Sequence, residues 1–288
     1  MHDFPHILNV IGAAPDAFLP ALPSAGEPRR LSAAAFDIPF AGDPLAALAA
    51  ARALAVGKAL DINVVPAERR RKMLLVADMD STIIGCECLD ELADMAGLKP
   101  QIAAITARAM QGEIAFEPAL RQRVAMLKGL PLSALERTWH ERVRFNPGAK
   151  ALAATMKRHG ARMLLVSGGF TYFTERVAAE AGFEEHLANT LLDDGQALTG
   201  EVAEPILGRE AKLAALEYEV KKLGIDFADA LAVGDGANDL AMIARAGLGV
   251  AYHAKPVVAE AAAARIDHHD LTALLYLQGY RDDEIVRG

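Results

Sequence analysis

From about residue 73 the chain contains short, continuously apolar runs, and each run ends in polar or glycine-rich residues. Three of them are Met73–Ala77, Met163–Val166 and Ala230–Val233, and Leu248–Ala251 is a candidate fourth. Runs of this length without polar alternation are typical of parallel β-strands that are covered on both faces. The pattern therefore predicts a buried parallel sheet in this part of the chain.

Helical segments separate these runs. The positions of their apolar residues place them at about 147–159, 171–181, 210–223, 238–246 and 256–265. Strands that alternate with helices form a doubly wound parallel sheet, in which ligands bind beyond the carboxyl ends of the strands. We expect the fold class to be α/β, with the functional site at this edge of the sheet.

Two segments depart from simple alternation. Residues 87–143 have a helical pattern and lie in an interval much longer than one crossover needs, so we expect an inserted helical cap at about 87–145. Residues 187–192 and 197–202 flank a turn sequence that contains Asp194-Gly195. This arrangement predicts a β-hairpin.

The first 72 residues have a pattern of their own. Candidate strands at Ile7–Ile11, Leu31–Phe36 and Ile62–Val65 surround an Ala/Leu-rich helix that runs to about residue 60. Asp43-Pro44 begins this helix as an N-cap and a first-turn proline. We expect a small α+β module at residues 1–72 and the α/β core at 73–288, joined by a basic run at 69–72 that serves as a solvated linker.

The composition excludes several classes of protein. Hydrophobic residues make up 52% of the chain and charged residues 24%, which is enough to bury a sizeable core and excludes disorder and fibrous repeats. The 30 Lys and Arg against 38 Asp and Glu give a net charge of −8. Nucleic-acid binding needs a basic surface, so no nucleic-acid partner is expected. An anionic ligand would have to meet local cationic side chains or a metal ion.

The two cysteines and the apolar stretches bear on the cellular compartment. Cys86 and Cys88 are too close in sequence for a useful structural disulfide, which favours a reducing compartment. The N-terminus lacks the basic end and apolar run of a secretory signal, and charges interrupt every apolar stretch before about 18 residues. We expect a cytoplasmic protein with no membrane partner, in which both cysteines are small buried residues.

Polar side chains follow three of the predicted strands at the point where each ends. The groups are Asp78 and Asp80; Ser167, Gly168 and Gly169; and Asp235, Asn238 and Asp239. Because the carboxyl ends of parallel strands meet at one edge, four carboxylates would crowd there, which is costly unless a divalent cation neutralises them. Oxygen ligands without His or Cys favour Mg²⁺ over zinc.

Each of these motifs alone is weak evidence, because polar residues after a strand more often form an ordinary turn or a helix cap. Their combination at successive strand ends favours a catalytic site. Competing phosphate-binding motifs are absent from the sequence. Gly234-x-Gly236 lacks the third glycine of the dinucleotide fingerprint, since Asp239 occupies that position, and the chain contains no P-loop sequence.

These residues resemble the motifs of the haloacid dehalogenase superfamily and, within it, the phosphoserine phosphatases. In order, the motifs match Asp78-Met-Asp80-Ser-Thr, Ser167-Gly168, Lys212 and Gly234-Asp235-Gly-x-Asn238-Asp239. The resemblance covers about residues 73–280 and continues in the cap at Glu87, Phe116 and Arg123. The N-terminal module resembles a degenerate ACT-like regulatory domain.

The resemblance implies hydrolysis of phosphoserine to serine and phosphate, the last step of serine biosynthesis, with Mg²⁺ as cofactor and an aspartyl-phosphate intermediate. Asp78 would be the nucleophile, and Asp80 the general acid and then the general base. The ion would be held by Asp78, the backbone carbonyl of Asp80 and Asp235, with Asp239 bracing the site. The phosphate contacts implied are Ser167, Gly168, Gly169, Lys212 and Asn238.

Substrate choice is expected to depend on the cap. By the same resemblance, Glu87 would bind the ammonium of phosphoserine, Arg123 would bind its carboxylate through a planar fork, and Phe116 would line the site. Taken without the resemblance, Glu87 and Arg123 read as exposed helical charges. Arg121 competes with Arg123, but only Arg123 has the expected spacing from Phe116.

Several alternatives stay open at this point. The motifs also fit another small-molecule phosphatase or a phosphotransferase on the same scaffold, and a non-catalytic serine-binding regulator is a third reading. Monomer and homodimer are both compatible with the sequence. His268-His269 is expected to lie in a solvated turn, since two adjacent imidazoles alone do not form a metal site.

Overall fold

The computed structural model describes residues 4–22, 24–110 and 113–287. At its centre lies a six-stranded parallel sheet in the order β12-β11-β10-β5-β6-β7. Its strands are β5 (Leu74–Ala77), β6 (Arg162–Phe170), β7 (Glu185–Asn189), β10 (Ala230–Gly234), β11 (Leu248–Tyr252) and β12 (Ala264–Ile266). The predicted α/β class with a parallel sheet is confirmed.

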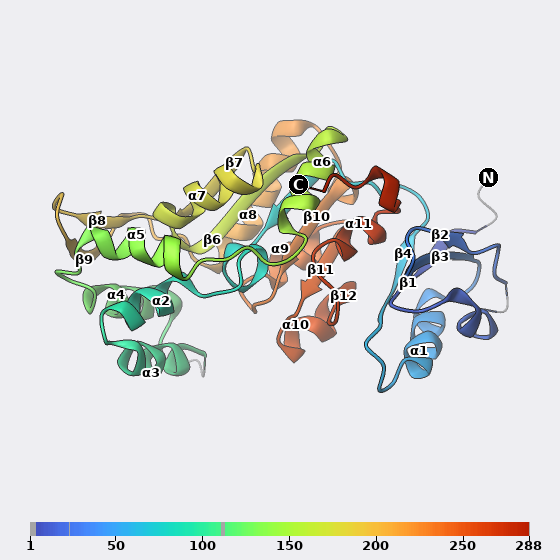
Figure 1. Ribbon diagram of the computed structural model, residues 1–288, viewed down its shortest axis with the longest axis horizontal. Helices are drawn as coiled ribbons and strands as arrows, with labels where there is room; N and C mark the ends of the chain where they lie inside the picture. The colour runs from blue at the N-terminus through green and yellow to red at the C-terminus, as the bar shows by residue number, and fades with distance from the viewer. Residues whose placement is uncertain (1–3, 23, 111–112, 288) are drawn as a thin grey trace.

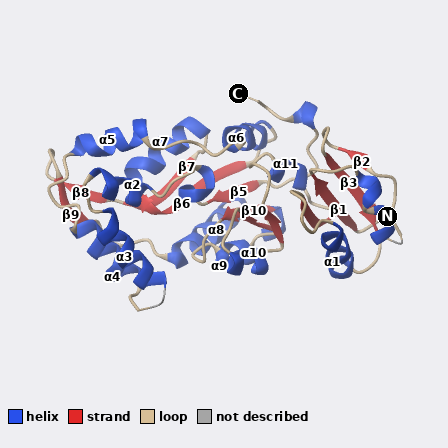
Figure 2. Ribbon diagram, turned by 60° about the horizontal axis from the view of Figure 1, so that its bottom comes forward, coloured by secondary structure: helices blue, strands red, loops and turns tan. Residues whose placement is uncertain are grey.

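Helices cover both faces of this sheet, as Figure 2 shows. One face is covered by α6 (Ala149–Arg158), α7 (Thr171–Ala181) and α11 (Ala273–Leu277), the other by α8 (Arg209–Leu223), α9 (Leu240–Arg245) and α10 (Pro256–Ala261). Within β5, Leu75 and Ala77 belong to the first core, while Leu74 and Val76 belong to the second. The strands β5, β10 and β11 are buried at every position, which explains why their sequences are continuously apolar.

The cap consists of four helices at one end of the molecule (Figure 1). They are α2 (Cys88–Met95), α3 (Lys99–Met110), α4 (Phe116–Ala125) and α5 (Leu132–Glu141). The hairpin of β8 (Leu191–Asp193) and β9 (Leu198–Val202) packs beside them. Two chain segments connect cap and core, and they pair with each other at an isolated bridge between Ile84 and Phe145.

The N-terminal module lies at the opposite end of the core from the cap (Figure 1). Its sheet has the order β2-β3-β1-β4, formed by β1 (His6–Ile11), β2 (Arg29–Arg30), β3 (Ala35–Phe40) and β4 (Asp61–Pro66). One face of the sheet, with Leu8 and Val10, packs on α1 (Pro44–Leu54). The other face, with Ile7 and Ile11, joins the core cluster that contains α11. Likeness to an ACT domain stays a prediction.

Short turns complete the chain. They are 3-10 turns at Pro15–Ala17, Leu19–Ala21, Phe227–Asp229 and Asp282–Glu284, and a π-helical turn at Met79–Ile83.

Two expectations about the N-terminal module are corrected. The strand predicted at 31–36 is Ala35–Phe40, and the charge of Asp37, which disguised it in the sequence, is paired with Arg70. The predicted helix begins as expected, with the Asp43 side chain accepting a hydrogen bond from Leu45 N at 2.9 Å. It ends at Leu54 and not near residue 60, and Gly57 then turns the chain with a positive φ of 76°.

Two further corrections concern short strands of the core. The segment predicted as a helix at 256–265 ends its helix at Ala261, and Ala264–Ile266 then pairs with β11 as the edge strand β12. The first arm of the predicted hairpin is divided. Residues 185–189 pair with β6 in the main sheet, and only 191–193 pair with β9.

The basic run at 69–72 is a solvated linker only in part: Arg69 and Arg71 are exposed, whereas Arg70 and Lys72 are not. The guanidinium of Arg70 pairs with Asp37 and donates hydrogen bonds to the carbonyls of Tyr276 and Leu277. The ammonium of Lys72 is buried and donates to the carbonyls of Arg69 and Ala228, both at 2.7 Å. These cations fasten the connection to both parts of the chain, because burial of a cation requires hydrogen-bonding partners.

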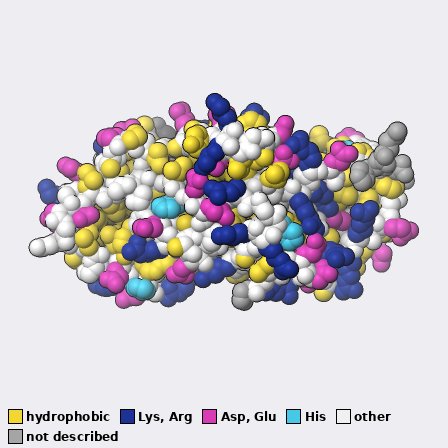
Figure 3. All heavy atoms as spheres, turned by 90° about the horizontal axis from the view of Figure 1, so that it is seen from above, with side chains coloured by type: hydrophobic (Ala, Val, Ile, Leu, Met, Phe, Trp, Pro, Cys, Tyr) yellow, Lys and Arg dark blue, Asp and Glu magenta, His cyan; other side chains and the backbone are white. Residues whose placement is uncertain are grey.

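The surface carries mixed charge. On the face drawn in Figure 3, basic and acidic side chains are interspersed along the length of the molecule. Among the described residues, no helix combines the length and the apolarity that crossing a bilayer requires.

Candidate active site

The polar segments that follow β5, β6 and β10 meet at one edge of the sheet. The backbone N–H of Asp78 donates to the carbonyl of Val233 at 3.0 Å, which joins the end of β5 to the end of β10. Ser167 lies within β6, beside β5 in the sheet. The edge at which ligands bind in such sheets therefore collects all three polar segments.

The chain turns sharply after β5. Residues 79–83 form a π-helical turn in which Ser81 has a positive φ of 56°. The Asp78 carboxylate accepts a hydrogen bond from Met79 N at 2.8 Å, and the amide of Asn146 donates to the carbonyl of Thr82 at 2.8 Å. Asn146 comes from the second connection between cap and core, so one buried turn is held from both sides.

Lys212 is the single ammonium in contact with this cluster among the described residues. Its Nζ lies 2.7 Å from Asp78 Oδ1 and 2.6 Å from Asp239 Oδ1. All three side chains are buried. Burial lowers the pKa of Lys212, but Asp78 and Asp239 together outweigh burial and raise it above the ordinary value. Lys212 is therefore a fixed positive charge at the edge of the sheet.

The carboxylates outnumber this one cation. Oxygen atoms of Asp78, Asp235 and Asp239 lie within 4.8 Å of one another. Burial and the charge of Asp78 raise the pKa of Asp235 to about 6 and that of Asp239 to about 7. Asp235 accepts a hydrogen bond from Thr82 at 3.4 Å. The excess negative charge and the all-oxygen donor set fit a hard divalent cation such as Mg²⁺.

Asp80 has a different environment. It is half-buried, and burial followed by the charges of Glu87 and Asp78 raises its pKa well above the ordinary value. Its Oδ1 accepts a hydrogen bond from Cys88 N at 3.3 Å. A Cβ atom placed on Gly169 would lie 2.8 Å from Asp80 Oδ2, so only glycine permits this approach. A carboxyl that keeps its proton is suited to act as a general acid.

The Ser167–Gly169 segment forms a bulge at the end of β6. Pairing of β6 with β7 shifts register between Val166 and Phe170, and Ser167 Oγ accepts a hydrogen bond from Gly169 N at 2.8 Å. The ring of Phe116, from the cap, lies 3.3 Å from where a Cβ of Gly168 would be. Asn238 lies in the turn after β10, with its Oδ1 against Gly236.

Two cap residues were expected to read the substrate. Glu87 accepts a hydrogen bond from Ser81 Oγ at 2.7 Å, and burial raises the pKa of Glu87. Arg123 is half-buried and donates to the carbonyl of Ala119 at 3.2 Å and to Thr106 at 3.3 Å. Burial lowers the pKa of Arg123, which the neighbouring Asp90 and Glu87 partly offset.

The competing arginine has another setting. Arg121 is exposed and pairs with Glu117 at 2.8 Å and with Glu204. A surface ion pair of this kind is typical of a solvated helix face. The two arginines thus differ in burial, and only Arg123 lies among the cap residues beside Glu87.

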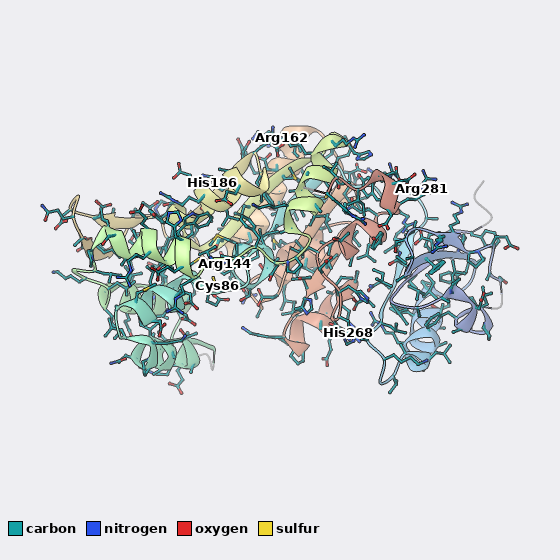
Figure 4. All side chains as sticks on the ribbon, viewed as in Figure 1. Cys86, Arg144, Arg162, His186, His268 and Arg281 are labelled. Atoms are coloured by element: carbon teal, nitrogen blue, oxygen red, sulfur yellow. The ribbon has the colours of Figure 1, made fainter. Side chains whose placement is uncertain are left out.

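Two expectations outside the motifs can be compared with the structure. Cys88 is buried and Cys86 half-buried at the junction of cap and core, near Arg144, as Figure 4 shows. His268 is exposed, as expected, whereas His269 is half-buried and its Nδ1 lies 2.7 Å from the buried Asp61 Oδ2. Figure 4 places the adjacent His268 between the core and the N-terminal module.

Sequence reasoning missed two asparagines at this edge, the half-buried Asn146 and the buried Asn189. Each uses its side-chain amide to hold backbone groups of the catalytic segments. A single asparagine outside a motif carries no signal in one sequence, since its partners are set by the fold.

Comparison with known proteins identifies relatives of this arrangement. The model of the haloacid dehalogenase-like hydrolases matches residues 75–244. A phosphoserine phosphatase from Polaromonas is 46% identical over 209 residues, which cover 71% of this chain and 89% of that protein. A phosphoserine phosphatase from Archaeoglobus fulgidus is 42% identical over 75% of this chain, which spans 63% of that protein.

Two solved structures are similar. A probable phosphoserine phosphatase from Vibrio cholerae has a TM-score of 0.79 at 28% identity. The match covers 96% of this chain and 86% of the Vibrio chain. A substrate-bound phosphoserine phosphatase has a TM-score of 0.66 at 37% identity and covers 71% of this chain and 97% of its own. The first similarity extends over the N-terminal module, since it leaves only 4% of this chain unmatched.

Proposed function

The chain belongs to the haloacid dehalogenase-like hydrolases, and we propose that it hydrolyses O-phospho-L-serine to L-serine and phosphate with Mg²⁺ as cofactor. The observation that carries the proposal is the cluster of Asp78, Asp235 and Asp239 around one lysine, with Asp80 beside it, whose pKa is raised. This cluster lies in a chain 46% identical to a named phosphoserine phosphatase. The proposed role of this reaction is the last step of serine biosynthesis.

Asp78 is the proposed nucleophile. Its carboxylate attacks phosphorus and forms an aspartyl-phosphate, which divides one difficult displacement into two easier ones. The hydrogen bond from Met79 N and the contact with Lys212 fix the orientation of the carboxylate. An oriented nucleophile lowers the entropic part of the barrier.

Asp80 is the proposed acid and base. In the first step it gives its proton to the departing seryl oxygen, and in the second it takes a proton from the attacking water. Its raised pKa supports the first role, because a raised pKa favours the protonated carboxyl that a general acid needs. The nearby Glu87 contributes to that raised pKa, so a cap residue bears on the chemistry of the core.

The carboxylates are the proposed ligands of Mg²⁺. Asp78 and Asp235, with the backbone carbonyl of Asp80, would hold the ion, and Asp239 would support the site through its contact with Lys212. When bound, the ion supplies positive charge that lets an anionic nucleophile approach an anionic phosphate.

Donors from three segments would hold the phosphate. Ser167, the amides of Gly168 and Gly169, the ammonium of Lys212 and the amide of Asn238 would donate hydrogen bonds to its oxygens. Donors that are fixed before the reaction stabilise the charge that develops in the transition state. Their convergence at one edge supports phosphoryl transfer over other chemistry.

Substrate recognition is assigned to the cap. Glu87 would accept the ammonium of phosphoserine, Arg123 would bind its carboxylate, and the ring of Phe116 would close over the Gly168 amide. In the structure both hydrogen bonds of Arg123 lie within the cap. Its guanidinium is thus placed by the cap helices and not by the phosphate site.

The test is phosphate release from a panel of phosphomonoesters together with acid quenching of the reaction. We expect the highest kcat/KM for O-phospho-L-serine and an acid-stable, base-labile phosphoryl group on the protein. Equal rates across the panel would favour another small-molecule phosphatase on this scaffold. Transfer of phosphate to added alcohols in preference to water would make the protein a phosphotransferase.

A further inference from the structure

Asn189, at the end of β7, is buried and contacts the Ser167–Gly169 segment. Its Nδ2 donates to the carbonyl of Gly168 at 2.9 Å and to the carbonyl of Leu207 at 3.3 Å, and its Oδ1 accepts from Leu207 N at 2.7 Å. Only 2% of this residue is exposed. One side-chain amide therefore joins two segments that are about forty positions apart in the chain.

The contact with Gly168 solves a problem that the bulge creates. Pairing of β6 with β7 shifts register after Val166 and resumes where Phe170 pairs with Asn189. A bulge removes backbone groups from the regular ladder, and a buried carbonyl needs another donor. The Asn189 amide is that donor, and it fixes the peptide plane between Gly168 and Gly169.

The contact with Leu207 fixes the segment that precedes Lys212. Gly208 follows directly and begins α8, which carries Lys212 in its first turn. The ring of Phe116 lies 3.7 Å from where a Cβ of Gly208 would be and 3.3 Å from where a Cβ of Gly168 would be. The two glycines form the surface on which the cap aromatic rests.

We infer that Asn189 is a positioning residue, which sets the Gly168–Gly169 amides and the lysine segment for the phosphoryl group. It does not touch substrate; it acts through the backbone of two segments that do. The inference rests on the proposed function, because the amides and Lys212 matter only if a phosphoryl group is transferred. Loss of the Asn189 amide is expected to slow the chemistry of every ester equally, since the phosphoryl group is common to all of them.

The decisive experiment compares Asn189→Asp and Asn189→Ala with the wild type on phosphoserine and on p-nitrophenyl phosphate. Aspartate keeps the volume of the side chain but loses the donated hydrogen bonds. We expect kcat to fall about 100-fold on both esters, the effect of misplacing reacting groups by about an ångström. The ratio of Asn189→Asp to wild-type kcat should rise as the pH falls, because a protonated aspartate can again donate to Gly168.

Asn63 provides the matched control. It is also a buried asparagine, and its side-chain amide forms two hydrogen bonds with the backbone of Arg265. The amide donates to the Arg265 carbonyl at 2.9 Å and accepts from the Arg265 N–H at 2.8 Å. It lies in the N-terminal module, away from the catalytic edge. Asn63→Ala should lower the melting temperature and leave kcat unchanged.

The outcomes separate the two proposals. A kcat within about threefold of wild type for Asn189→Asp, with no pH-dependent recovery, would overturn the inference and leave the proposed function intact. If the wild type cleaves p-nitrophenyl phosphate but not phosphoserine, the proposed function is wrong. The role of Asn189 is then tested by the kcat of Asn189→Asp on p-nitrophenyl phosphate. If Asn189→Ala does not fold, the isosteric Asn189→Asp decides alone.

Discussion

Two regions of this molecule bury polar side chains, and they treat charge differently. One is the catalytic edge of the central sheet, around Asp78 and Lys212. The other is the interface between the N-terminal sheet and the C-terminal segment of the core. The same residue types, Asp, Asn and a single cation, occur in both regions. Their hydrogen-bond partners differ, and the difference separates a site that performs chemistry from one that holds the fold together.

At the interface the polar side chains bind backbone groups. Asp61 accepts from the N–H groups of Asp267 and His269 at 2.7 and 3.0 Å, and from the ring of His269 at 2.7 Å. Asp37 is paired with Arg70, which in turn binds two carbonyls of the C-terminal segment. Each carboxylate has its own donors, which is the requirement for burying a charge without loss of stability.

At the catalytic edge three carboxylates share one ammonium. The pKa values of Asp235 and Asp239 are raised to about 6 and about 7, as burial and the charge of Asp78 dictate. Like charges held this close are unfavourable until a cation enters. Buried carboxylates whose charge is not fully compensated thus occur at the catalytic edge, whereas those at the structural interface are fully compensated.

The largest expected effect is on the rate of catalysis, at the catalytic edge of the central sheet. Asp78→Asn should reduce kcat by about 10⁴-fold or more, because an amide is a poor nucleophile, while Lys212 keeps its contact with Asp239. The free energy of unfolding should change by less than about 1 kcal/mol, since a like charge is removed together with an ion pair. Steady-state phosphate release and urea unfolding measure the two quantities. Substantial hydrolysis by this variant would overturn the assignment of the nucleophile.

The second effect is on stability at the balanced interface. Arg70→Ala leaves Asp37 buried without its cation and should cost about 3–5 kcal/mol of unfolding free energy. Its kcat should match the wild type, because Arg70 lies away from the catalytic edge. The control is Arg71→Ala, whose partner Glu284 is on the surface, with an expected cost of about 0–1 kcal/mol. Equal losses for the two variants would refute the contrast.

The third effect tests substrate recognition by the cap. Arg123→Ala should lose about 2–5 kcal/mol of transition-state binding for phosphoserine, or tens to thousands of fold in kcat/KM. Phosphoethanolamine, which lacks the carboxylate, should be hardly affected. Arg121→Ala is the matched control, since its exposed guanidinium pairs only with surface glutamates. Equal losses on both substrates would mean that Arg123 supports the cap and does not read the carboxylate.

The smallest effect is a pH dependence of the unfolding free energy that arises at Lys72, in the connection between the N-terminal module and the core. Burial lowers the pKa of Lys72 to about 8, whereas an unfolded lysine titrates near about 10.4. Between these values the unfolded chain binds more protons than the folded one, so the contribution of Lys72 to stability rises with pH. Relative to Lys72→Met, the wild type should gain about 1 kcal/mol per pH unit in this window. Urea unfolding at several pH values measures it, and a flat difference would contradict the prediction.

The sequence predicts the elements that depend on local pattern. Continuously apolar strands such as 74–77 and the Asp43-Pro44 helix start are visible because burial and capping act on neighbouring residues. The strand at 264–266 is not, because it is short and depends on its pairing with β11. The sequence assigned part of the segment at 185–189 to a hairpin, whereas the segment pairs with β6. The reason is the same, because its polar residues lie at the exposed edge of the sheet.

The candidate site divides in the same way. Asp78 and Asp235 were predicted to converge because parallel strands end at one edge, and their carboxylates do meet there. Lys212 was assigned by the family resemblance, and its Nζ lies 2.7 Å from Asp78 Oδ1. Asn146, Asn189 and Arg70 were not identified, or were assigned to solvent. Their partners are backbone groups far away in the chain, and no local pattern encodes such contacts.

The most direct test of the central claim is the dependence of phosphoserine hydrolysis on a divalent cation. The wild type is freed of metal with a chelator, returned to buffer without it, and assayed for phosphate release before and after Mg²⁺ is added. We predict no turnover without the ion and full recovery with it, because the carboxylates of Asp78 and Asp235 otherwise repel the substrate. Undiminished turnover by the metal-free protein would contradict it.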